Sequence, residues 1–124
     1  MPEWTKHPAR PVRIAILLFD RFSNLCLANC IEPLRAANTL GARTVFDWQI
    51  VSPDGQTVQS SSGIDIVASA PVGDVKSLDY LFVMASYAHD GHDTPANRRL
   101  LRQMARRCDV TVGFDAGPWL LASA

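Results

Sequence analysis

The fold is decided by one stretch of sequence, CDVTVGFDAGPWLLASA at residues 108–124. The apolar run at residues 109–114 predicts a strand, and the spacing of Gly113 and Gly117 predicts a sharp turn after it. The apolar residues that follow Pro118 predict the start of a helix. A strand, a tight turn and a helix in this order form a nucleophile elbow, which holds one side chain above the end of a parallel sheet. Asp115 occupies the presented position.

The chemistry of Asp115 predicts binding rather than catalysis. Aspartate has no thiol or hydroxyl with which to attack a carbonyl. Backbone amides at the start of the following helix favour its charged form. We therefore expect Asp115 to hold a cation or a hydrogen-bond donor, and we expect that the chain is not an enzyme.

The rest of the chain alternates between strand and helix patterns. Apolar runs at 12–19 and 78–85 predict strands buried on both faces of a sheet, and 46–51 predicts a further strand. Helical spacing is found at 24–40, with Asn24 as the expected cap, and again after Thr94 or Asp93 with Pro95 in the first turn. Pro33 predicts a kink or break of the first helix near residues 28–32, which would place Glu32 in a distorted segment. A short polar hairpin is expected at 56–68.

This alternation predicts an α/β fold with a doubly wound, mostly parallel sheet of the flavodoxin-like type. Residues 1–11 contain three prolines and predict a flexible arm, whereas residues 12–124 predict one α/β domain. Because the last helix begins just before the sequence stops, we expect a chain truncated at its C-terminus. A sheet left open in this way would be covered by dimerisation.

Composition excludes several partners. The 124 residues contain 12 Lys and Arg and 12 Asp and Glu, so no net field attracts nucleic acid or an anionic membrane. No apolar run approaches the roughly 20 residues of a membrane-spanning helix, and the first residues lack a signal-peptide core. Three cysteines, Cys26, Cys30 and Cys108, argue against a disulfide framework and fit a reducing compartment. We expect a cytoplasmic protein.

Several of these stretches together resemble the amino-terminal domain of AraC-family transcriptional regulators, which has a class I glutamine amidotransferase-like (PfpI-like) fold. The resemblance rests on the first strand, the run CIEPLRAAN at residues 30–38, the turn SPDG at 52–55, and the elbow with WLLA after it. It implies an effector-sensing and dimerisation domain that works without catalysis and without a cofactor. The effector would be a small nitrogenous metabolite, cationic or zwitterionic. DNA would be bound only through a C-terminal helix-turn-helix domain that is absent from this chain.

The resemblance also assigns site residues. In the catalytic relatives a cysteine stands at the elbow and a glutamate from the first helix approaches it; these positions fall on Asp115 and Glu32 here. Tyr87 or Trp119 could provide an aromatic wall for a cation. We expect a ligand pocket at the carboxyl ends of the strands, formed by Asp20, Glu32, Ser86, Tyr87, Asp115 and Trp119.

Other interpretations stay open. A PfpI-like hydrolase, amidase or glyoxalase-type enzyme would need Cys30 or Cys108 in place of the elbow thiol. Glu32 and Asp115 could act as an acid/base pair, and the arginines of residues 98–107 could contact phosphates. Cys26 and Cys30 with the histidines of residues 89–92 could bind zinc, but buried helix cysteines beside a polar loop explain the pattern more simply. We therefore expect no metal site.

Overall fold

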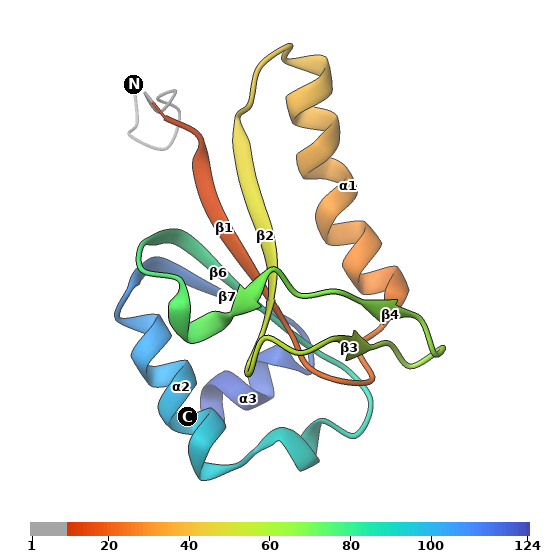
Figure 1. Ribbon diagram of the computed structural model, residues 1–124, viewed down its shortest axis with the longest axis vertical. Coiled ribbons are helices and arrows are strands. Elements are labelled where there is room, and N and C mark those ends of the chain that lie inside the picture. The colour runs from red at the N-terminus through yellow and green to blue at the C-terminus, as the bar shows by residue number, and fades with distance from the viewer. Residues whose placement is uncertain (1–9) are drawn as a thin grey trace.

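The computed structural model describes residues 10–124, whose centre is a five-stranded sheet with every neighbouring pair parallel (Figure 1). The strand order is β5-β2-β1-β6-β7. The strands are β1 (Val12–Leu18), β2 (Phe46–Ser52), β5 (Ala70–Pro71), β6 (Leu78–Ala85) and β7 (Cys108–Asp115). The predicted doubly wound α/β sheet is confirmed, and the short edge strand β5 is an addition that the sequence pattern did not indicate.

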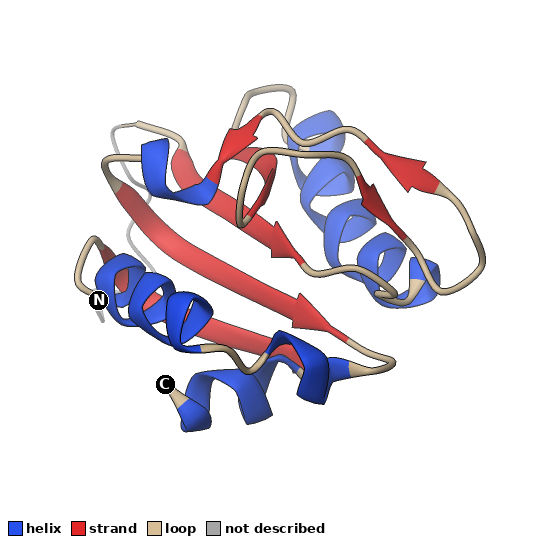
Figure 2. Cartoon of the chain, turned by 60° about the horizontal axis from the view of Figure 1, so that its bottom comes forward, coloured by secondary structure: helices blue, strands red, loops and turns tan. Residues whose placement is uncertain are grey.

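Helices cover both faces of the sheet (Figure 2). One face carries α1 (Asn24–Leu40) and the antiparallel hairpin of β3 (Val58–Gln59) and β4 (Asp65–Ile66). The hairpin was predicted, but its place on this face was not. The other face carries α2 (Pro95–Ala105) and α3 (Gly117–Ser123). Two short 3-10 helices, η2 (Val72–Asp74) and η3 (His89–His92), lie in the connections.

Helix α1 differs from its prediction in two details. Its N-cap is Ser23, whose hydroxyl accepts a 3.3 Å hydrogen bond from the Cys26 N–H, so the predicted cap at Asn24 is one residue too late. The helix also runs through Pro33 as one continuous element, so the predicted break is wrong. A single proline removes one backbone hydrogen bond, and the burial of Leu27 and Cys30 against the sheet keeps the helix in place.

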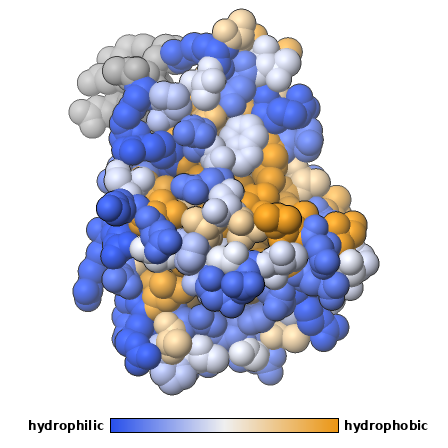
Figure 3. Space-filling model, viewed as in Figure 1, coloured by the Kyte–Doolittle hydropathy of each residue, from blue (hydrophilic) through white to orange (hydrophobic). Residues whose placement is uncertain are grey.

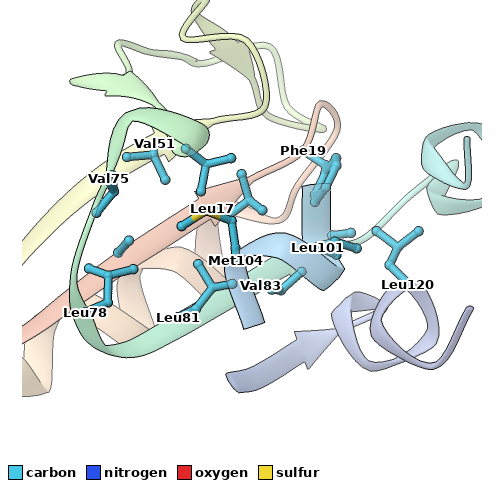
Figure 4. Packing of buried hydrophobic residues seen from close by; sticks show 13 residues of the cluster. Leu17, Phe19, Val51, Val75, Leu78, Leu81, Val83, Leu101, Met104 and Leu120 are labelled. Atoms are coloured by element: carbon cyan, nitrogen blue, oxygen red, sulfur yellow. The ribbon is translucent and has the colours of Figure 1, made fainter. Parts of the chain in front are cut away.

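Helix α2 begins as predicted. The Thr94 hydroxyl accepts a 3.1 Å hydrogen bond from the Asn97 N–H, and Pro95 occupies the first turn. Its buried residues Leu101 and Met104 pack on the sheet together with Leu120 of α3 (Figure 4). Burying one such side chain fully stabilises the fold by about 1.5–3 kcal/mol.

The described chain starts with an anchored residue. The predicted arm at residues 1–11 falls mostly on residues 1–9, which lie outside the described part. Arg10 lies within it and forms a bidentate pair with Asp79, at 2.8 and 2.9 Å. Asp79 also accepts a 2.7 Å hydrogen bond from the Arg13 N–H. These contacts tie the start of β1 to β6.

The surface seen in Figure 3 is largely hydrophilic, with apolar side chains gathered where α1 meets the β3–β4 hairpin. Within residues 10–124, none of the helices combines the length and the apolar character needed to cross a bilayer.

Candidate functional site

The predicted elbow is present at the end of β7. Asp115 is the last residue of the strand and has a φ of 56°, in the left-handed region that non-glycine residues rarely occupy. A Cβ at Gly113 would lie 2.6 Å from the Pro118 nitrogen, and a Cβ at Gly117 would collide with the carbonyl oxygen of Val83. Both positions therefore require glycine, which is why the small-residue spacing identified the turn.

Neighbouring strands hold the elbow in place. The Ala116 N–H donates a 2.8 Å hydrogen bond to the carbonyl of Ala85, and Asp115 stands beside Ala85 in the β6–β7 register. The carboxylate of Asp115 is thus presented at the carboxyl edge of the sheet, and its residue is exposed. Side chains at this edge are the usual ligand contacts of open α/β sheets.

A hollow of about 310 Å³ lies between the elbow and α1. We call it the elbow hollow. Its lining residues come from the start of α1 and the end of β7: Ser23, Leu25, Cys26, Asn29, Cys30, Phe114 and Asp115.

Burial raises the pKa of the Cys26 thiol, and the nearby Asp115 charge raises this pKa further. Burial, followed by the neighbouring Cys26, raises the pKa of Cys30 to about 11. Both thiols are therefore neutral at pH 7, and Asp115 is the charged group of the hollow.

Glu32 does not line the elbow hollow. It is exposed, and its carboxylate pairs with Arg35 at 2.8 Å on the surface of α1. Glu32 follows Cys26 by six residues, which turns it about 120° away from the face that Cys26 presents. The α1 residues that line the elbow hollow are Leu25, Cys26, Asn29 and Cys30, and Glu32 is not among them.

Ser86 does not line the elbow hollow but contacts Ser23, which does. Its side chain is buried, and its hydroxyl accepts a 3.0 Å hydrogen bond from the Ser23 N–H at the start of α1. Tyr87, the next residue, is 62% exposed and outside the elbow hollow, and its N–H donates to the Arg21 carbonyl at 3.3 Å.

The aromatic residue that lines the elbow hollow is Phe114. Its ring packs edge-on against Phe82, with 5.0 Å between ring centroids. Trp119 instead packs edge-on against His89 of η3, at 4.8 Å, and is 44% exposed. Phe114 could not be identified from the sequence, because strand alternation alone does not say which face of the sheet α1 covers.

Asp20 lies in a different hollow. This second hollow, of about 580 Å³, is formed by the end of β1, the loop after β2, η3 and the first turns of α2. We call it the β1–β2 hollow. The residues predicted to share one pocket are thus divided, with Asp115 in the elbow hollow and Asp20 in the β1–β2 hollow.

The alternative sites have little structural support. Residues 10–124 contain no group of three or more His, Cys, Asp or Glu side chains that could hold a metal ion. Cys108 starts β7, at the opposite end of the strand from the elbow. Among the arginines of α2, Arg98 pairs with Asp93 at 2.6 Å.

Comparison with curated proteins finds transcriptional regulators. The HTH-type transcriptional regulator GbdR of Pseudomonas aeruginosa is 32% identical over 114 residues, which is 92% of this chain and 31% of that protein. The HTH-type transcriptional regulator GlxA of Rhizobium meliloti is 34% identical over 113 residues, which is 90% of this chain and 35% of that protein. The chain thus spans about a third of the length of the curated relatives it matches. No family model matches the chain.

Solved structures that are similar to this chain include a transcriptional regulator as well. An AraC family transcriptional regulator from Pseudomonas putida superposes with a TM-score of 0.79 at 30% identity, covering 92% of this chain and 71% of that one. A ThiJ/PfpI family protein from Pseudomonas syringae superposes with a TM-score of 0.73 at 19% identity, covering 99% of this chain and 50% of that one, and shows the same fold. The chain therefore belongs to the AraC family of transcriptional regulators and has the PfpI-like, glutamine amidotransferase-like fold.

Proposed function

We propose that this chain is the effector-sensing and dimerisation part of its regulator, and that it binds a small nitrogenous metabolite at the elbow hollow without transforming it. One observation carries the proposal: the elbow presents an exposed carboxylate, Asp115, against a wall of apolar side chains and neutral thiols. A protein keeps a strained residue at such a turn only where the surrounding structure stabilises it, and such residues cluster at functional sites.

The charge and lining of the hollow select the ligand class. A carboxylate attracts a cation, and the apolar lining from Leu25, Cys26 and Phe114 accommodates a hydrocarbon shell around the charge. Phe114 gives the hollow an aromatic side chain, and contact of a cation with an aromatic face adds about 0.5–2 kcal/mol. A cationic or zwitterionic amine compound meets these requirements.

The remaining predicted residues take outer roles in this proposal. Ser86 positions the start of α1 through Ser23. Tyr87 and Trp119 are exposed at the same edge of the sheet and offer an aromatic surface to a ligand larger than the hollow.

The relatives are transcriptional regulators, and this suggests the role of the whole protein. We propose that the regulator works in the cytoplasm as a homodimer and binds DNA through a helix-turn-helix domain outside this chain. The apolar side chains left exposed in this chain, Leu25, Val110 and Trp119 among them, favour association with a second copy.

The second candidate function is a PfpI-like hydrolase, amidase or glyoxalase-type enzyme. Cys26 is the observation that favours it, because this thiol lies beside the elbow carboxylate. A nucleophilic cysteine needs a lowered pKa, whereas burial and the Asp115 charge raise the pKa of Cys26. We therefore place binding ahead of catalysis.

Calorimetric titration with betaine-like and amino-acid-like compounds tests the sensor proposal. Asp115→Asn keeps the side-chain volume and removes the charge, so we expect binding to weaken by about one to two orders of magnitude. Asp109→Asn is the matched control, because Asp109 is exposed at the other end of β7, and this variant should bind as the parent does. Equal affinity for Asp115→Asn, or tighter binding of an anionic compound, would reject the cation site. Turnover that disappears on alkylation of the cysteines would favour the enzyme instead.

A further inference from the structure

We propose that the β1–β2 hollow is a second ligand site, separate from the elbow hollow, and that it takes a small organic cation rich in N–H donors, with a primary ammonium or a guanidinium group. The hollow lies at the carboxyl ends of β1 and β2, where open α/β sheets bind ligands. Its volume of about 580 Å³ is in the range of small-molecule sites.

Two carboxylates, those of Asp20 and Asp54, line this hollow and act as acceptors. Asp20 accepts a 3.0 Å hydrogen bond from the Gln59 N–H through one carboxylate oxygen, and Asp54 accepts one of 3.0 Å from the Gln56 N–H in the same way. In the described part of the chain, these are the hydrogen bonds that the two carboxylates form, so each keeps its second oxygen for a ligand.

Asn97 adds one more acceptor. His92 also lines the hollow, and its Nε2 donates a 3.0 Å hydrogen bond to the Asp20 carbonyl oxygen, which can only accept. The Asn97 side-chain N–H donates to the His92 carbonyl at 2.9 Å, which leaves the amide oxygen of Asn97 as an acceptor. The acceptors Asp20, Asp54 and Asn97 thus come from three different segments that meet at one hollow.

The charge of the hollow is unbalanced. No Lys or Arg is found among its described lining residues, although it contains Asp20 and Asp54. Elsewhere in residues 10–124, Glu32, Asp79 and Asp93 each pair with an arginine. Two carboxylates without a cation beside them favour a bound positive charge.

The apolar residues of the lining determine what connects the donor groups of the ligand. Phe19 and Val58 are buried residues of the lining, and Leu100 lines the hollow from α2. They accommodate a short hydrocarbon chain between donor groups. A quaternary ammonium has no N–H with which to reach the acceptors, and an anion would be repelled, so neither fits this hollow.

Titration of backbone amides by NMR tests the proposal, with 1,4-diaminobutane and agmatine as donor-rich probes and tetramethylammonium as a cation without donors. We expect the amides of residues 54–58 and 92–97 to shift with the donor-rich probes, and tetramethylammonium to bind there at least about tenfold more weakly. The double variant Asp20→Asn/Asp54→Asn keeps both backbone hydrogen bonds possible and should raise Kd about tenfold. Asp47→Asn, at an exposed position near the start of β2, is the control and should leave Kd unchanged.

Three results would overturn this inference: no shift at these amides up to millimolar probe, equal affinity for tetramethylammonium, or a double variant that melts like the parent and binds as tightly. Shifts confined to residues 23–30 and 114–115 would also reject it, because they report the elbow hollow. Different amides therefore report binding at the two hollows, so the experiment can reject one proposal and leave the other standing.

Discussion

The Ser86 hydroxyl accepts a 3.0 Å hydrogen bond from the Ser23 N–H, and this bond joins the end of β6 to the first turn of α1. Ser86 is only 8% exposed, and the bond is partly buried. Ser23 caps α1, the helix that carries Cys26. The position of the α1 residues that line the elbow hollow with Asp115 therefore depends on this contact.

Replacing Ser86 with alanine tests that dependence. Ser86→Ala leaves a partly buried N–H without its acceptor, so we expect a loss of about 1–2 kcal/mol in the free energy of unfolding. Binding at the elbow hollow should weaken as well. Ser123→Ala is the control: Ser123 donates to the Trp119 carbonyl at an exposed position, so we expect a change within about 0.5 kcal/mol. Urea titration measures both, and equal losses would contradict the role of Ser86.

Gly117 is the least replaceable residue of the elbow. The Cβ of Gly117→Ala would collide with the Val83 carbonyl oxygen and lie 2.9 Å from the carbonyl carbon, and this rigid backbone cannot move aside cheaply. We expect a destabilisation of about 3 kcal/mol or more, measured by urea unfolding. Gly91→Ala should be close to neutral, because nothing lies within 4 Å of its added Cβ. A Gly117→Ala protein as stable as Gly91→Ala would rule out the tight elbow.

The pair between Arg10 and Asp79 predicts a pH dependence of stability. The hydrogen bond from Arg10 comes first among the causes that hold the pKa of Asp79 below its usual value. A lowered pKa means that the stabilisation is complete above the pKa of the unfolded state, about 3.9. It is lost as the pH falls through the lower pKa of the folded state. Asp79→Asn should therefore lower the urea midpoint at pH 7, and the difference from the parent should shrink towards about pH 2.

The control for this measurement is Asp47→Asn, for which we expect the same pH profile as the parent. A difference between Asp79→Asn and the parent that stays constant from neutral to acid pH would mean that Asp79 acts through packing rather than charge.

The cysteines of the elbow hollow should react slowly with iodoacetamide. With its pKa raised to about 11, Cys30 has roughly a hundredfold less thiolate at neutral pH than an ordinary cysteine. We expect mass spectrometry to show Cys30 alkylated far more slowly than glutathione in the same tube. Unfolding in urea should remove the protection. Rapid alkylation of Cys30 in the folded protein would contradict the buried neutral thiol and support thiol chemistry.

Sequence patterns located most strands because buried parallel strands are continuous apolar runs, as at 12–19 and 78–85. The elbow could be found because Gly113 and Gly117 leave no room for a side chain. The sequence could not show that Glu32 lies outside the elbow hollow, because the contacts of a helix face depend on its phase on the sheet, which tertiary packing sets. The division into two hollows was equally hidden, since it depends on how the loop after β2 meets η3 and α2.

The two ends of the sheet differ in their contacts. Arg21, Ala88 and Asp115, which follow or end β1, β6 and β7, all have φ between 53° and 67°. The opposite end is fastened by Arg10 and Asp79 instead. Substitutions that strengthen the amino ends of the strands are therefore expected to raise the heat tolerance of this protein without altering the carboxyl ends, where we propose that ligands bind.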